Sequence, residues 1–216
     1  MTNLSSALDR IGEQIRSSFS AKHEARDKAI KSSREAIYKC STSIRAAHRG
    51  EYDLASSLAD EAKAILNEVS DAIAGHDDLR YTGFVLDSQK EYTEARITLA
   101  LISGQSIPEP DSLGVEYSAY LNGLGEAAGE LRRHLLDRMR RGELDRCESV
   151  LGMMDDIYNL LVTIDFPDAM TGGLRRTTDM VRGVLERSRG DLTVSLRQKE
   201  LEIKLEKFNR NLGNQG

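Results

Sequence analysis

Residues 113–142 read LGVEYSAYLNGLGEAAGELRRHLLDRMRRG, and this stretch decides the fold class. Projected at about 100° per residue, its larger apolar side chains fall on one face of a helix. That face consists of Tyr117, Tyr120, Leu124, Ala127, Leu131 and Leu135. No proline interrupts the pattern before Gly142, and glycine is the residue type that commonly ends a helix. The stretch therefore predicts one long amphipathic helix from Leu113 to Arg141.

The same pattern, usually ended by glycine, covers the rest of the 216-residue chain. The helices we expect span residues 3–19, 22–49, 51–74, 79–103, 113–141, 143–162 and 174–212, the last broken at Gly190. The three prolines fall in two loops, residues 105–112 and 165–173, and no segment is convincing as a strand. We therefore predict an all-α protein, an elongated seven-helix bundle that forms a single domain over residues 1–216.

Two turns repeat the same chemistry. Arg49-Gly50-Glu51 resembles Arg141-Gly142-Glu143, with a cation in a last helical turn, glycine at the cap and an acid beginning the next helix. This order suits the dipoles of both helices. Shared turn chemistry explains the similarity better than an internal duplication. It predicts two antiparallel helix hairpins with very short connections.

The composition excludes several classes of protein. Hydrophobic residues make up 39% and charged residues 30% of the chain, and the net charge is -5. A strongly basic nucleic-acid binder is excluded as a description of the whole chain, although a local basic surface is not. No apolar run approaches the length of a membrane span, and residues 1–10 do not resemble a signal peptide. The two cysteines, Cys40 and Cys147, fit neither a metal motif nor a disulfide framework, so we expect a reducing, cytoplasmic location.

Two acidic pairs have a spacing that places both carboxylates on one helix face. Glu91 and Glu94 lie at i,i+3, and Glu126 and Glu130 lie at i,i+4. The helix over residues 79–103 is apolar nearly all round, which predicts that it is buried. Its narrow polar stripe consists of Asp87, Glu91, Glu94 and Thr98. Buried carboxylates are costly without partners, and a divalent cation is one good partner.

The second pair, Glu126 and Glu130, projects roughly opposite the apolar face of its helix. Taken alone, this position is typical of ordinary acids that face solvent. To form a site, the outer face of this helix must line a cleft or an enclosed cavity, which a hollow oligomer would supply. Four converging carboxylates would suit a Mg²⁺ ion that hydrolyses phosphodiesters.

Other motifs add little chemistry. Neither a nucleophile elbow nor a glycine-rich phosphate loop occurs, and the four histidines show no paired metal spacing. His76-Asp77-Asp78 fits a helix N-cap better than a metal site. Basic residues gather in two places, at Arg45, His48 and Arg49 and at Arg132, Arg133, Arg138, Arg140 and Arg141. Such clusters either complement helix dipoles or contact a phosphate backbone.

Four segments carry a resemblance to the translin/Trax family. Residues 22–49 resemble the family's first long helix, residues 89–95 (QKEYTEA) resemble the Trax stretch QEYVEA, and residues 120–131 (YLNGLGEAAGEL) resemble its YLLGVADLTGEL. Residues 174–186 are similar, more weakly, to the last helix of the family. The resemblance spans about residues 20–190, and it is closer to Trax (translin-associated factor X) than to translin.

This resemblance implies a seven-helix fold, a hollow octamer and binding of single-stranded RNA and DNA. Trax-type subunits are Mg²⁺-dependent endoribonucleases, and their acids fall on Glu91, Glu94, Glu126 and Glu130 of this sequence. Position 126 holds Glu where Trax is expected to hold Asp, which shifts the metal geometry by one methylene. Translin has an apolar residue there, so an acid of either length favours the Trax type.

We therefore expect a hydrolase that cleaves single-stranded RNA inside an oligomeric cage, with Mg²⁺ or alternatively Mn²⁺ on the four carboxylates. Arg45, His48 and Arg49 are the first candidates for nucleic-acid contacts, followed by Arg132 and Arg133. The assembly would be a homo-octamer or would include a translin-type partner subunit, without a membrane. The alternatives are a non-catalytic protein of translin type that binds single-stranded RNA or DNA, and a helical scaffold that needs neither metal nor nucleic acid.

Overall fold

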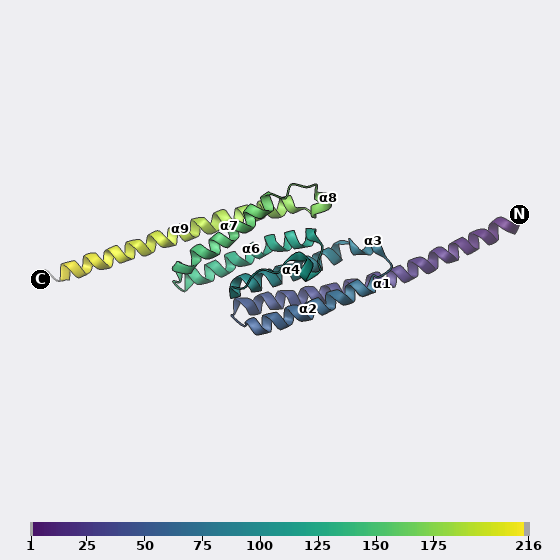
Figure 1. The fold of residues 1–216 in the computed structure, drawn as a ribbon, viewed down its shortest axis with the longest axis horizontal. Helices are drawn as coiled ribbons and strands as arrows, with labels where there is room; N and C mark the ends of the chain where they lie inside the picture. Colours follow the sequence, from purple (N-terminus) through teal and green to yellow (C-terminus); the bar gives the residue numbers. More distant parts are fainter. Residues whose placement is uncertain (1, 214–216) are drawn as a thin grey trace. The chain divides into compact units, whose positions relative to one another are not determined.

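A computed structural model describes residues 2–213 of the chain (Figure 1). Its regular structure is entirely helical, without a strand in the described residues, so the all-α prediction is confirmed. The helices are α1 (Thr2–His48), α2 (Tyr52–Ala72), α3 (Asp77–Arg80), α4 (Gly83–Ser103), α5 (Pro110–Leu113), α6 (Tyr117–Arg140), α7 (Cys147–Val162), α8 (Asp168–Thr171) and α9 (Leu174–Gly213). One 3-10 turn, Leu144–Arg146, precedes α7.

The helix boundaries differ from the sequence expectation in several places. The helix predicted from Leu113 to Arg141 begins only at Tyr117, because Gly114 ends the one-turn helix α5 with a left-handed φ of 62°. The helix predicted from residue 143 begins at Cys147, after the 3-10 turn. The helices expected over residues 3–19 and 22–49 are one continuous helix, α1, because nothing between them breaks a helix. Helix α9 likewise continues through Gly190; a single interior glycine costs only about 1 kcal/mol relative to alanine, which a long helix tolerates. The helix expected from residue 79 begins at Gly83, after the one-turn helix α3.

The described chain forms two compact units that divide between Gly123 and Leu124, inside α6. The first unit contains α1 to α5 and the beginning of α6. The second contains the rest of α6 together with α7, α8 and α9. The expectation of a single domain over residues 1–216 stays a prediction.

In the first unit, α1 and α2 pack along each other, and α4 packs against both (Figure 1). The buried faces of α1 and α2 are rich in alanine, with side chains at most 1% exposed at Ala29, Ala36, Ala46, Ala47, Ala55, Ala59 and Ala62. Small side chains let helix axes approach closely. The buried hydroxyl of Ser43 on α1 also donates a 2.7 Å hydrogen bond to the carbonyl oxygen of Ala55 on α2. Close packing of the α1 and α2 backbones therefore stabilises the first unit.

The two similar turns adopt the conformation that the sequence predicts. Gly50 has a φ of 78° and Gly142 a φ of 76°, both in the left-handed region that favours glycine. Beside the first turn, Arg49 donates to both carboxylate oxygens of Glu51. Beside the second, Arg138 lies 3.0 Å from Glu143. Each glycine and its ion pair thus reverse the chain within a few residues.

In the second unit, α7 packs along α9 (Figure 1). Both helices carry fully buried side chains, among them Met154 and Leu161 on α7 and Val181 and Leu192 on α9. Arg132 on α6 donates hydrogen bonds to Ser188 Oγ at 3.0 Å and to Asp191 at 2.7 Å, which ties α6 to α9. None of the helices in residues 2–213 combines the length and apolar character that crossing a bilayer requires.

Ala59→Leu tests the close packing of the first unit. Ala59 is fully buried, so three extra heavy atoms have no space, and overpacking costs about 1–3 kcal/mol. We expect a lower midpoint of urea unfolding. Ala64→Leu, on the exposed side of α2, is the matched control and should leave the midpoint nearly unchanged. Equal midpoints for both variants would contradict the packing described here.

Candidate metal centre

Helix α4 is buried on most of its circumference, as its apolar composition predicts. Its buried side chains, at most 8% exposed, are Val85, Ser88, Tyr92, Thr93, Ala95, Ile97, Thr98, Leu99, Ala100 and Ile102. Glu91 and Glu94 lie on this helix, and neither is exposed. Thr98, one turn after Glu94, has a buried hydroxyl oxygen without a hydrogen-bond partner. Of the polar stripe predicted from the sequence, Asp87 is exposed, whereas Glu91, Glu94 and Thr98 lie where water is largely or partly excluded.

Gly123 sets how closely the beginning of α6 approaches α4. A Cβ atom at this position would lie 2.5 Å from the carbonyl oxygen of Lys90 and 2.8 Å from Cβ of Thr93. Real Cβ atoms do not come so close, so only glycine permits this contact. Glu91 and Glu94 flank the contact on α4, and Glu126 follows Gly123 by about one turn of the same helix. Glu91 and Glu94 therefore lie beside the glycine contact, and Glu126 lies on the next turn of the helix that makes this contact.

Glu91, Glu94 and Glu126 form a carboxylate cluster. Each offers one oxygen, and these three oxygens all lie within 4.8 Å of one another. Three negative charges at this separation repel each other strongly where water is partly excluded. Carboxylate oxygens are hard ligands that suit Mg²⁺, whose bonds to oxygen are about 2.1 Å long, and they also suit Mn²⁺. The donor set therefore fits a divalent cation.

Two neighbours of the cluster have no signal in the sequence that connects them with it. Lys90 Nζ lies 3.7 Å from Glu91 Oε1 and offsets part of the negative charge. Cys40 on α1 is fully buried, and burial raises the pKa of its thiol to about 12, with Glu91 and Glu94 acting in the same direction. The cysteine is thus a neutral thiol beside the acids. Only packing of α1 on α4 brings it there.

Glu126 and Glu130, predicted as one pair, have different surroundings. Glu126 belongs to the three-carboxylate cluster, whereas Glu130 does not. The carboxylate of Glu130 lies 3.8 Å from Arg133. Glu126 is half-buried rather than solvent-facing, because α6 also buries small residues such as Gly123 and Ala128 beside its apolar stripe. Tyr117, which we expected on the buried face, is 63% exposed.

The predicted nucleic-acid contacts fall into two groups. Arg45 and Arg49 are exposed near the end of α1, and His48 is half-buried between them. Arg45 donates to Thr42 Oγ1 at 2.9 Å, and Arg49 is held by Glu51. On α6, Arg133 is exposed. Arg132, by contrast, is only 23% exposed and bonds to α9, so its present contacts are structural. The role of these residues in nucleic-acid binding stays a prediction.

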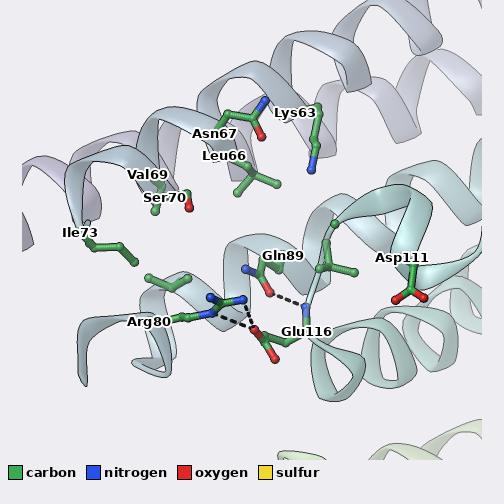
Figure 2. A pocket seen from close by; sticks show the side chains of 13 residues that line it. Lys63, Leu66, Asn67, Val69, Ser70, Ile73, Arg80, Gln89, Asp111 and Glu116 are labelled. Atoms are coloured by element: carbon green, nitrogen blue, oxygen red, sulfur yellow. Dashed lines mark hydrogen bonds and ion pairs between the residues drawn. The ribbon is translucent and has the colours of Figure 1, made fainter. Parts of the chain in front are cut away.

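A separate cavity of about 310 Å³ lies in the first unit (Figure 2). Its apolar wall includes Leu66 and Val85. Its charged groups already have partners: Lys63 donates to the carbonyl oxygen of Leu113, Arg80 lies 2.9 Å from Glu116, and Asp111 accepts from the Tyr117 hydroxyl. The backbone N–H of Glu116 in turn donates to the side chain of Gln89. These polar groups stabilise the wall itself, and the carboxylate cluster is not part of it.

Comparison with known proteins finds one relative with a similar sequence. The uncharacterized protein MJ0175 of Methanocaldococcus jannaschii is 30% identical over 191 residues, a match that covers 86% of this chain and 83% of the relative. No family model matches the chain.

Three solved structures are similar in fold. The structure of AfC3PO in complex with duplex RNA has a TM-score of 0.77 and 28% identity over 86% of this chain and 96% of that one. A crystal structure of AfC3PO has the same TM-score with 29% identity, over 86% of this chain and 97% of the other. The apo-NeC3PO structure, at 21% identity and a TM-score of 0.71 over 87% and 96% of the chains, supports the fold alone. C3PO is the translin/Trax complex, and these similarities do not distinguish the two subunit types.

Gly123→Ala tests whether the glycine contact organises the cluster. The added methyl group must push α6 away from Lys90 and Thr93, which lowers the free energy of unfolding by about 1–3 kcal/mol and weakens Mn²⁺ binding. Gly129→Ala is the control, because open space surrounds Gly129 and alanine should stabilise the helix by about 0.5–1 kcal/mol. Urea unfolding and Mn²⁺ titration measure both effects. Unchanged Mn²⁺ affinity in Gly123→Ala would rule out this role.

Proposed function

We propose that this chain, which belongs to the same family as protein MJ0175 of Methanocaldococcus jannaschii and has the fold of C3PO, is a metal-dependent endoribonuclease. The observation that carries the proposal is the half-buried cluster of Glu91, Glu94 and Glu126. Three acids held together on two rigid helices are costly without a cation. The order in which these acids occur also matches the Trax pattern that the sequence resembles.

RNA is the substrate that the comparisons favour. The AfC3PO structure contains duplex RNA, and the present chain shares its fold and 28% of its residues over most of its length. We extend RNA binding to this chain on that basis. The further specification, that the cleaved strand is single, rests on the resemblance to Trax. Single-stranded DNA would be bound through the same phosphate contacts.

The carboxylates of the cluster would act by binding a metal ion and by orienting the water that the ion activates. Glu91, Glu94 and Glu126 would bind Mg²⁺ or Mn²⁺, and Glu130, one turn along α6, would complete the set through water. When bound, such an ion supplies an activated water and neutralises charge that builds on the phosphate. Lys90 beside Glu91 would limit repulsion between the acids. Partial burial excludes bulk water and strengthens the interaction of these charges with phosphate.

The exposed arginines would hold the RNA backbone. Arg45 and Arg133 are each exposed, and the planar guanidinium group suits phosphate oxygens. Arg49 would contribute by releasing Glu51 and binding phosphate instead. Half-buried His48 is the remaining residue at this end of α1 that we propose to contact RNA. Arg132 would act indirectly, because its bonds to Ser188 and Asp191 hold α6 on α9.

The assembly that we propose is an oligomer of the C3PO kind. A homo-octamer or an octamer with a translin-type partner subunit would enclose RNA and increase the number of phosphate contacts. The cluster, however, takes its three acids from one chain. In the proposed site the acids of one chain would hold the metal ion, and the cage would add contacts to RNA.

Glu126→Gln tests the metal site without changing side-chain volume. Losing one carboxylate charge at the ion should cost about 3 kcal/mol of transition-state stabilisation, which is a decrease of more than about 100-fold in cleavage rate. Affinity for single-stranded RNA should stay the same or rise slightly, because a negative charge near phosphate is removed. Cleavage of a labelled RNA in Mg²⁺, Mn²⁺ or EDTA provides the measurement.

Glu68→Gln, on the exposed surface of α2, is the control and should cleave like the original chain. Salt-sensitive RNA binding without cleavage by the original chain would instead support a non-catalytic protein of translin type. Cleavage that continues in EDTA or in Glu126→Gln would exclude the three-carboxylate mechanism.

Arg45→Ala tests the phosphate contacts. Removing one arginine that contacts phosphate should weaken RNA binding similarly for all sequences and reduce the slope of log affinity against log salt by about 1. Fluorescence anisotropy over a range of salt concentrations measures this slope. Arg197→Ala, an equally exposed arginine of α9 that pairs with Glu200, is the control. If both variants keep the original slope, Arg45 does not contact the backbone.

A further inference from the structure

The first turns of α1 present an apolar stripe to solvent. These turns extend past the end of α2 within the first unit (Figure 1). The stripe consists of Leu4, Leu8, Ile11, Ile15 and Phe19, and between 48% and 69% of each residue is exposed. Single exposed apolar residues are ordinary, but five on one helix face form a contiguous surface of the kind that marks an interaction site.

The spacing of the stripe is that of a helix that pairs with another helix. Its members follow one another at intervals of four, three, four and four residues, which keeps them on one face because a helical turn contains about 3.6 residues. Projected at about 100° per residue, the positions bordering the stripe are small and uncharged: Ser5, Ala7, Gly12 and Ser18. Glu13 lies on the opposite side, where it pairs with Arg16. These small borders leave room for close approach, and the charged group nearest to them is the guanidinium of Arg16, which lies 3.3 Å from the position that a Cβ atom on Gly12 would take.

We propose that the same stripe of a second copy of this chain covers it, with the two helices antiparallel. The pattern is self-complementary in that direction. Leu4 of one copy meets Phe19 of the other, Leu8 meets Ile15, and the two Ile11 side chains meet at the two-fold axis. Such an isologous contact is the commonest way in which identical chains associate.

The area that this contact buries is sufficient for a specific interface. Burying one large apolar side chain removes roughly 100 Å² from water. Two stripes of five such residues would therefore bury on the order of 1,000 Å² in total, which is about the threshold for a specific interface. The pairing would also stabilise turns of α1 that would be marginally stable as an isolated helix in water.

Another exposed apolar stripe in the described residues is a less suitable partner for the α1 stripe. Helix α9 exposes Val194, Leu201, Leu205 and Phe208. Arg197 and Lys204 border this stripe within about 70° of its centre. Pairing it with α1 would bury those two cations against Ala7, Gly12 and similar residues that offer no carboxylate, which is unfavourable. The small residues that border the α1 stripe, with Arg16 already paired to Glu13, match a second α1 instead.

Disulfide trapping of Ile11→Cys in the full-length chain tests the pairing. Near the two-fold axis the new thiols should form a disulfide under mild oxidation, so that most of the chain runs as a covalent dimer on a non-reducing gel. Cys40 and Cys147 do not interfere, because both are buried and burial raises the pKa of each thiol. Glu13→Cys is the matched control on the opposite face and should stay uncrosslinked.

Two further variants test whether the paired helices run antiparallel and whether the stripe contributes to assembly. Leu8→Cys alone should crosslink weakly in an antiparallel pair and strongly in a parallel one. Leu8→Lys combined with Ile15→Lys should lower the mass of the assembly measured by light scattering, while the circular dichroism of the helices stays close to that of the original chain. Equal crosslinking of Ile11→Cys and Glu13→Cys, or an unchanged mass in the double lysine variant, would overturn the proposal. Because it does not involve the carboxylate cluster, RNA cleavage tests the proposed function separately.

Discussion

The close approach of α6 to α4 at Gly123 is the constraint on which the candidate site depends. A side chain as small as a methyl group would collide with the backbone of Lys90 and the side chain of Thr93. Glu126 follows Gly123 on the same helix, and one of its oxygens lies within 4.8 Å of oxygens of Glu91 and Glu94. The same approach creates electrostatic repulsion, since three carboxylates meet in a half-buried place. A bound cation would offset the repulsion between the carboxylates. The packing of α6 on α4 therefore has a chemical consequence.

The rest of the first unit holds α4, with its two acids, in place. Alanine-rich faces bring α1 and α2 together, and both pack on α4. Cys40 of α1 thereby lies beside the two acids of α4 as a neutral thiol, so it adds no further charge. Functional groups on packed helices are held more accurately than groups on loops.

The arginines show how similar residues in one sequence take different roles. Arg132 and Arg133 are neighbours, but Arg132 turns towards Ser188 and Asp191 while Arg133 stays exposed. Arg49 is held by an acid two residues away at the glycine turn. A cluster of cations in a sequence therefore overstates the positive surface that is available to phosphate. This division is consistent with a protein whose net charge is -5 and whose phosphate contacts would be local.

The sequence by itself determined the features that depend on neighbours along the chain. Helical periodicity fixed the all-α class, glycine at positions 50 and 142 fixed the two turns, and the i,i+3 spacing fixed Glu91 and Glu94 on one face. The tertiary structure alone decided that Glu126 joins them, that Glu130 pairs with Arg133, and that Cys40 lies close by. It also decided that α1 is one helix. The reason is physical: periodicity reports the direction of a side chain about its own helix, whereas the helix that it meets depends on contacts between residues far apart in the chain.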